Sequence, residues 1–177
     1  MVVSDSELVE AVARDRAAGL TVAFANGCFD LLHVGHVRYL QGSAAEGDRL
    51  IVAVNDDRSV AGLKGDGRPI LTAADRAELV AALRCVDYVV VFGDATVERL
   101  LLLVKPDVHC KGTDYTVESV PERAVVAGYG GRTAIVGDPK SHATRELLER
   151  IAGTSHDAPR TSEAAALRTS HLADPDR

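Results

Sequence analysis

The sequence predicts a doubly wound α/β fold, in which a five-stranded parallel sheet carries helices on both faces. Short apolar runs alternate with segments of helical spacing five times along the chain. The runs are continuously apolar rather than alternating, which is typical of strands buried on both faces. The 177 residues, of which 46% are hydrophobic and 26% are charged, suffice for one domain with a sizeable core.

The expected strands are the apolar runs at residues 21–26, 49–55, 88–92, 107–110 and 133–136. Helices are expected from Ser4 or Asp5 to about residue 18, at 36–46, from residue 72, at 96–104, near 121–127 and near 144–151. Thr72 is expected to cap a helix whose apolar face carries Leu79, Val80 and Leu83.

Two stretches of the chain are expected to lack regular structure. Residues 61–71 contain three glycines and a proline, which predicts a loop. After Gly153 the hydrophobic density falls while Ser, Thr, Asp and Pro become frequent. We therefore expect residues 1–152 to form a single domain and residues 153–177 to form a flexible tail.

The composition argues against several classes of partner. A net charge of -6 disfavours a nucleic-acid-binding surface. The apolar run at residues 100–104 is too short to span a membrane, and MVVSDSELVE lacks the pattern of a signal peptide. Cys28, Cys85 and Cys110 have no metal-ligand spacing and are expected to be reduced thiols. We expect a cytoplasmic protein with no nucleic-acid or membrane partner.

The first expected strand leads directly into NGCFDLLHVGHVRYL, residues 26–40. Ligands of open parallel sheets bind at the carboxyl ends of strands, so a site is expected here. His33 and His36 are three residues apart at the start of a helix, whose unpaired N–H groups attract anions. Gly35 carries no side chain, so a phosphate can approach the backbone. The pattern predicts a phosphate cradle without a P-loop lysine; the alternative is a pair of structural histidines.

GCFDLLHVGH resembles the signature of the HxGH nucleotidyltransferases, the superfamily of cytidylyltransferases, pantetheine-phosphate adenylyltransferase and class I aminoacyl-tRNA synthetases. The resemblance covers residues 4–151 and implies a Rossmann-like nucleotidyltransferase fold. Within the superfamily, three further segments resemble the heptose 1-phosphate adenylyltransferases, which make ADP-heptose. These segments are DRLIVAVNDDRSV (48–60), LKGDGRPILTAADRAELVAAL (63–83) and KPDVHCKGTDY (105–115).

The resemblance implies a reaction in which a sugar-phosphate oxygen attacks the α-phosphorus of ATP directly and pyrophosphate leaves in line. The partners are then ATP and a sugar 1-phosphate. Mg²⁺ is expected with ATP as the cofactor, held mostly by phosphate oxygens and water, because no carboxylate cluster suggests a dedicated metal site. The resemblance also suggests a homodimer.

The resemblance assigns site residues one by one. The catalytic residues are expected to be His33, His36 and Lys64. The nucleotide-binding residues are expected to be Gly27, Cys28, Phe29, Gly35, Arg76, Lys111, Gly112, Asp114, Thr144 and Arg145. The residues expected to bind the substrate are Asp30 and Asp57.

Several of these residues have a simpler alternative role. Lys64 lies in the expected glycine loop and is either a phosphate ligand or a solvated charge. Arg76 either faces the phosphates or forms a surface ion pair with Asp75 or Glu78. Asp30 can fix its own loop through backbone N–H groups. Asp57 faces either substrate or water.

One segment departs from the family pattern. The family carries a Ser-Thr-Thr run at the start of its last helix, and this chain has Ala143-Thr144-Arg145. Arg145 is either a forked phosphate donor or the surface partner of Glu149. Three functions stay open: a heptose 1-phosphate adenylyltransferase, a cytidylyltransferase for glycerol 3-phosphate or another small acceptor, and a nucleotide-binding homologue with weakened catalysis.

Overall fold

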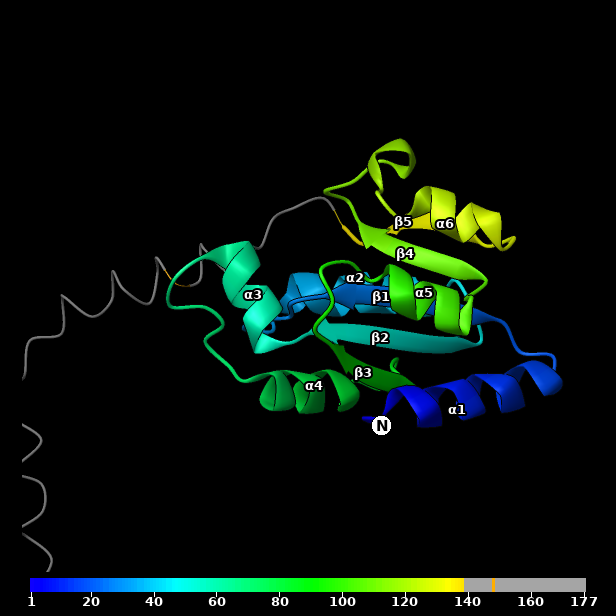
Figure 1. Ribbon diagram of the computed structural model, residues 1–177, viewed down its shortest axis with the longest axis horizontal. Coiled ribbons are helices and arrows are strands. Elements are labelled where there is room, and N and C mark those ends of the chain that lie inside the picture. The colour runs from blue at the N-terminus through cyan, green and yellow to red at the C-terminus, as the bar shows by residue number, and fades with distance from the viewer. Residues whose placement is uncertain (139–147, 149–177) are drawn as a thin grey trace, which may run out of the picture. The chain divides into compact units, whose positions relative to one another are not determined.

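The computed structural model describes residues 1–138 and residue 148. Five strands form one parallel sheet in the order β3-β2-β1-β4-β5 (Figure 1). Their bounds are β1 Val22–Gly27, β2 Arg49–Asn55, β3 Tyr88–Phe92, β4 Val108–Gly112 and β5 Arg132–Val136. Each agrees with the predicted range to within two residues, and the predicted α/β fold is confirmed.

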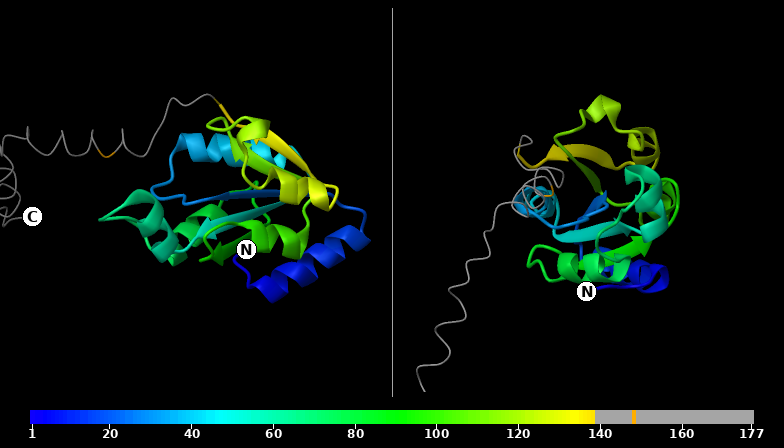
Figure 2. Two further views of the ribbon diagram at one scale, coloured as in Figure 1. Left: turned by 45° about the horizontal axis from the view of Figure 1, so that its top comes forward. Right: turned by 90° about the vertical axis from the view of Figure 1, so that its left-hand side faces the viewer.

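Helices cover both faces of the sheet (Figures 1 and 2). Their bounds are α1 Asp5–Ala17, α2 Val34–Ala44, α3 Asp57–Lys64, α4 Ala73–Ala81, α5 Glu98–Val104 and α6 Arg123–Gly128, with a short 3-10 turn η1 at Val117–Ser119. Leu40 of α2 and Val80 of α4 belong to the core on one face. Leu8 of α1, Leu101 of α5 and Val126 of α6 belong to the core on the other face.

Polar side chains cap α1, α2, α3 and α4, because the N–H groups of a first helical turn have no partners within the helix. Ser4 forms a capping box with Glu7 at the start of α1. The Thr72 side chain accepts a hydrogen bond from the Asp75 N–H at the start of α4. Both caps were predicted from the sequence and are confirmed.

The predicted loop at residues 61–71 is partly wrong, because α3 extends to Lys64. Asp56 caps α3 by accepting a hydrogen bond from the Ser59 N–H, which favours a helix directly after β2. The helix ends at Gly65, whose φ of 86° is a left-handed conformation that glycine adopts without steric cost.

The predicted apolar face of α4 also needs correction. Leu79 is 44% exposed, whereas Arg76, Ala77 and Val80 are buried. These three residues lie on one side of the helix, four residues apart at most, and this side faces the sheet. Leu83, beyond the end of α4, does pack against the core as predicted.

Several predictions fall outside the described residues. They concern Thr144 and Arg145, the last helix and the tail at 153–177, and they stay predictions. Among the helices of the described part, none has the length and apolar character needed to cross a bilayer.

Candidate active site

The sheet order creates one topological switch point, between β1 and β4. The chain moves from β1 outward through β2 to β3, and then returns to β4 on the other side of β1. Ligands of open α/β sheets bind beyond the carboxyl ends of strands at such a point. The loop after β1 and the end of β4 both lie there, so the fold brings the histidine motif and Lys111 to the same edge.

His33 and His36 are stacked on each other, with 3.9 Å between their ring centroids. His33 caps α2, because its Nδ1 accepts a hydrogen bond of 3.1 Å from the Gly35 N–H. The helix therefore begins at Val34, two residues before the predicted start. Since Nδ1 is the acceptor, a proton on the His33 ring lies on Nε2.

The His36 ring is held in its neutral form. Burial lowers its pKa to about 4, and the nearby charges of His33 and Lys64 lower it in the same direction. Phe29 contacts the ring edge-on at 5.4 Å between centroids. At neutral pH the histidine pair therefore offers N–H donors without a formal charge on His36.

Lys64 is the last residue of α3, rather than part of a loop, and it is exposed. Its positive charge acts on this motif: after burial and the charge of His33, it is the next cause that lowers the pKa of His36, and it opposes the rise that burial gives the pKa of Cys28. Gly65 follows with a conformation that favours glycine. The catalytic role of Lys64 stays a prediction.

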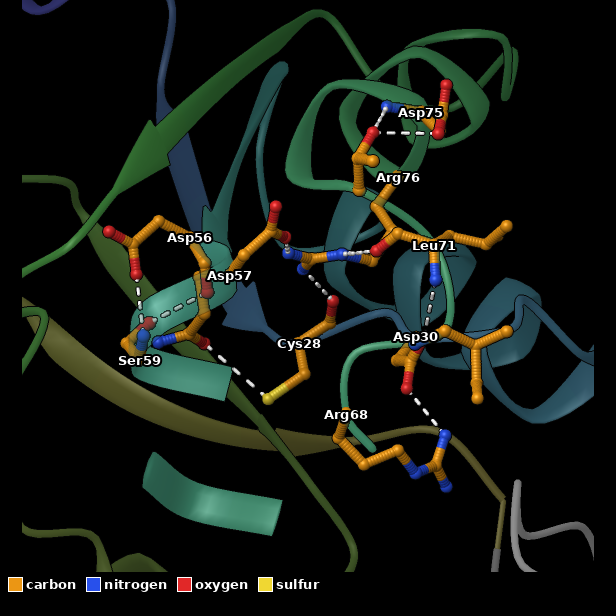
Figure 3. A network of polar contacts seen from close by, with 12 residues as sticks. Cys28, Asp30, Asp56, Asp57, Ser59, Arg68, Leu71, Asp75 and Arg76 are labelled. Atoms are coloured by element: carbon orange, nitrogen blue, oxygen red, sulfur yellow. Dashed lines mark hydrogen bonds and ion pairs between the residues drawn. The ribbon is translucent and has the colours of Figure 1, made fainter. Parts of the chain in front are cut away.

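Arg76 is fully buried and does not form the surface ion pair with Asp75 or Glu78 that was considered as an alternative. Its guanidinium donates to the Cys28 carbonyl at 2.5 Å, to the Leu71 carbonyl at 3.0 Å and to Asp57 at 2.8 Å (Figure 3). Three segments are thereby held together: the loop after β1, the start of α3 and the segment before α4. Its contact with nucleotide stays a prediction.

Asp30 is also fully buried and anchors the segment before α4. Its carboxylate accepts hydrogen bonds from the Ile70 N–H at 2.9 Å and the Leu71 N–H at 3.3 Å, and forms an ion pair with Arg68 at 2.5 Å (Figure 3). Asp30 thus accepts from backbone N–H groups, as the sequence analysis considered, but these belong to the segment before α4, 40 residues away, and not to its own loop. Its contact with substrate stays a prediction. Asp57 is half-exposed, and its carboxylate forms an ion pair with the buried Arg76 guanidinium.

The remaining motif residues shape the loop between β1 and α2. Phe29 is buried and has a φ of 49°, which is uncommon for a residue with a side chain. A Cβ on Gly27 would lie 3.2 Å from the Phe29 ring, so glycine permits this close contact. The Cys28 thiol is 3.9 Å from Asn55 Oδ1, and burial raises its pKa. Cys28 therefore stays a protonated thiol at neutral pH, and its contact with nucleotide stays a prediction.

Lys111 is buried at the end of β4 instead of reaching into solvent. Its ammonium donates to Asn26 Oδ1 of β1 at 3.0 Å and to Glu122 at 3.3 Å. His109 Nε2 lies 3.1 Å from the same Asn26 oxygen. Sequence reasoning missed Asn26, His109 and Glu122. Asn26 opens the quoted motif and could have been singled out, whereas nothing local distinguishes Glu122.

The other predicted site residues differ in their surroundings. Gly112 ends β4 and is partly buried, and Asp114 is exposed in the turn that follows. Thr144 and Arg145 lie outside the described residues. In the part of the chain that the structure describes, no three His, Cys, Asp or Glu side chains are grouped to hold a metal ion.

Comparisons with known proteins agree with this fold and site. A family model described as cytidylyltransferase-like matches residues 24–157. Bifunctional protein HldE of Pseudomonas fluorescens (strain SBW25) is 47% identical over 150 residues, which are 85% of this chain and 32% of that protein. HldE of Geobacter sulfurreducens is 46% identical over 140 residues, which are 79% of this chain and 29% of that protein. The chain spans about a third of the length of these curated relatives.

A solved structure gives the same result at the level of the fold. The lipopolysaccharide core biosynthesis protein from Thermoplasma volcanium GSS1 matches with a TM-score of 0.60 and 28% sequence identity, over 69% of this chain and 100% of that chain. The matched family model includes the histidine motif and the end of β4, which meet at the switch point, and it also includes Lys64. The chain therefore belongs to the cytidylyltransferase-like family and is a nucleotidyltransferase.

Proposed function

We propose that this nucleotidyltransferase is a heptose 1-phosphate adenylyltransferase, which transfers AMP from ATP to a heptose 1-phosphate. The observation that carries the proposal is the stacked His33–His36 pair beside Lys64 at the switch point. The similarity to HldE over 85% of the chain supports it. The segment at residues 105–115 supports the heptose acceptor, because it resembles that branch of the superfamily.

In the proposed reaction a phosphate oxygen of the sugar bonds to the α-phosphorus of ATP. The bond between this phosphorus and the oxygen bridging to the β-phosphate breaks, and pyrophosphate leaves with the electron pair. Negative charge grows on the leaving group. His33 and His36 donate N–H groups to that charge, Lys64 adds a positive charge, and no covalent enzyme intermediate is needed.

We propose that Mg²⁺ accompanies ATP as the cofactor, with phosphate oxygens and water as its main ligands. Hard oxygen donors of this kind suit Mg²⁺, and ATP itself supplies them. A homodimer and a cytoplasmic location are part of the same proposal, on the family resemblance alone.

Pyrophosphate release by the purified chain tests the proposal. ATP and CTP are each paired with both anomers of heptose 1-phosphate and with glycerol 3-phosphate. We expect turnover with ATP and one heptose 1-phosphate. Turnover restricted to CTP and glycerol 3-phosphate would make the protein a cytidylyltransferase, which the description of the matched family favours. Nucleotide binding without turnover in any pair would instead identify a binding homologue.

A pair of lysine variants tests the site within that assay. Lys64→Gln is expected to lower kcat/KM by about tenfold or more, because a cation near the leaving group is lost. Lys105→Gln is the matched control. Lys105 is exposed at the end of α5, and its backbone carbonyl is the group that accepts a hydrogen bond, from Arg16. Equal losses in the two variants would remove Lys64 from the catalytic site.

A further inference from the structure

A buried ion pair links three elements at the switch point. Lys111 lies near the end of β4, and Glu122 directly precedes α6. The Lys111 ammonium is 3.3 Å from the Glu122 carboxylate and 3.0 Å from Asn26 Oδ1, at the end of β1. Both charged side chains are less than a tenth exposed. The pair therefore holds a cation beside the crevice where ligands of this fold bind.

Stability alone does not account for this arrangement. Desolvation makes a buried ion pair a weak stabiliser, and apolar side chains of similar volume often serve as well. The network is also incomplete, because Glu122 Oε2 and His109 Nδ1 are buried and have no hydrogen-bond partner among the described residues. An ammonium has three N–H donors, and the described acceptors Asn26 and Glu122 take two.

The positions of the basic side chains around the site indicate which substrate would accept the third N–H of the Lys111 ammonium. Lys64 lies beside the histidine motif, which suits the triphosphate. Arg68 and Arg76 already form ion pairs with Asp30 and Asp57. Lys111 comes from β4, which flanks β1 on the side away from β2. It is therefore suited to the second anion of the proposed reaction, which is the phosphate group of the acceptor.

We propose that Lys111 binds the phosphate group of the acceptor, and that Glu122 is the positioning residue that keeps this ammonium charged and directed toward the end of β1. The inference rests on the proposed function and deepens it. It assigns Lys111 to the acceptor rather than to the nucleotide, for which the sequence analysis had selected it. It gives Glu122 a role that acts through Lys111.

The charge state of Lys111 depends on its surroundings. Burial lowers the pKa of Lys111, whereas the charge and hydrogen bond of Glu122 raise it. His109 on β4 is neutral, because burial lowers its pKa to about 3. The Tyr115 ring lies 5.5 Å from the ammonium, and the Tyr39 hydroxyl of α2 donates to the Cys110 carbonyl.

Removing the Glu122 charge should therefore lower the pKa of Lys111 further. Glu122→Gln keeps the shape and a hydrogen-bond acceptor but loses the charge. Glu46→Gln is the matched control, since it removes a carboxylate from an ion pair with Arg132, at the amino end of β5. The pKa of Lys111 is measured by NMR titration of protein carrying ¹³C-labelled lysine, with the resonance assigned through Lys111→Met.

We expect Glu122→Gln to lower the Lys111 pKa by roughly one unit or more, the usual effect of losing a close opposite charge, and Glu46→Gln to leave it unchanged. In the kinetic assay, Glu122→Gln should shift the basic limb of kcat/KM for the acceptor to lower pH. The KM of the acceptor at pH 8.5 should rise about tenfold, and the KM of ATP should change less than about twofold. Equal Lys111 titrations in wild type and Glu122→Gln would overturn the proposal.

A double variant separates positioning from structural support. Lys111→Met combined with Glu122→Leu removes both charges, so the protein should remain folded with a melting temperature near that of wild type. We expect its acceptor KM to stay raised. Recovery of the wild-type KM would show that the pair is only structural.

Binding of inorganic phosphate separates this proposal from the proposed function. If wild type turns over none of the sugar phosphates, the adenylyltransferase assignment fails. Phosphate titrated into ¹³C-lysine protein still tests the anion site. We expect it to raise the pKa of Lys111 in wild type and to leave the pKa of the exposed Lys105, at the end of α5, unchanged. Absence of that rise would overturn the anion site independently of catalysis.

Discussion

Two buried charge networks lie at the carboxyl edge of the sheet, and they differ in how completely they are bonded. In the first, Arg76 and Asp30 each have three described partners, most of them backbone groups. In the second, Lys111 and Glu122 bond mainly to side chains, and a Glu122 oxygen has no described partner. A saturated network fixes the backbone, whereas an unsaturated one retains bonding capacity for a ligand.

The largest effect is expected from the saturated network. Arg76→Leu should lower the free energy of unfolding by about 3–5 kcal/mol, because three acceptors lose their donor. Urea denaturation measures this, with Arg38→Leu as the control. Arg38 pairs with Asp138 at the surface, and its loss should cost less than about 1 kcal/mol. If both variants lost the same stability, the contrast between the two networks would disappear.

A second prediction concerns the histidine pair, which belongs to neither network. His36→Ala should lower kcat/KM by about a hundredfold, the usual cost of losing a donor to transition-state charge. Urea denaturation should show a folded protein, because His36 lies in the first turn of α2 and contributes to the reaction rather than to the core. Near-wild-type turnover would remove His36 from the reaction.

The third prediction concerns the pH dependence of stability that comes from His109, which contacts Asn26 in the unsaturated network. Burial lowers the pKa of His109 to about 3, below the usual value of 6.5. Between these values the unfolded chain binds more protons than the folded chain, so this group's contribution to stability is lost as pH falls below 6.5. From pH 6.5 to 5 the loss is about 1–2 kcal/mol, or on the order of 5 °C in melting temperature.

His109→Leu provides the comparison. Its melting temperature should fall less steeply over the same pH range than that of wild type. His36, whose pKa is lowered to about 4, contributes a similar slope in both proteins. Parallel melting curves in wild type and His109→Leu would contradict the neutral, buried state of His109.

The smallest effect is expected from a helix cap. Thr72→Ala should cost about 1 kcal/mol, because the Asp75 N–H loses its acceptor at the start of the helix that carries Arg76. Thr96→Ala is the control, at an exposed threonine just before α5, a helix with no side-chain cap. Equal melting temperatures for the two variants would show that the cap does not support the saturated network.

Local sequence signals predicted the strands and two caps, because apolar runs and capping residues act over a few positions. The end of β2 was harder to interpret. Asp56 caps a helix there, yet the glycines at 62, 65 and 67 favoured a loop. The partners of Arg76 could not be predicted, since Asp57 and Cys28 are 19 and 48 residues away along the chain. Glu122 was missed for the same reason: only folding brings it beside Asn26 and Lys111.

The central position of β1 has a consequence for how the protein is made. β1 pairs with β4 through Ala23 and Val108, and the Val22 N–H bonds to Asp107 over a separation of 85 residues. Until the ribosome has released β4, one edge of β1 has no native partner, and unpaired strand edges bind other strands. The nascent chain thus carries an open apolar edge while the 85 residues between Val22 and Asp107 are made. Fragments that stop before residue 107 should aggregate, and the pairing of β1 with β4 should limit the rate of refolding.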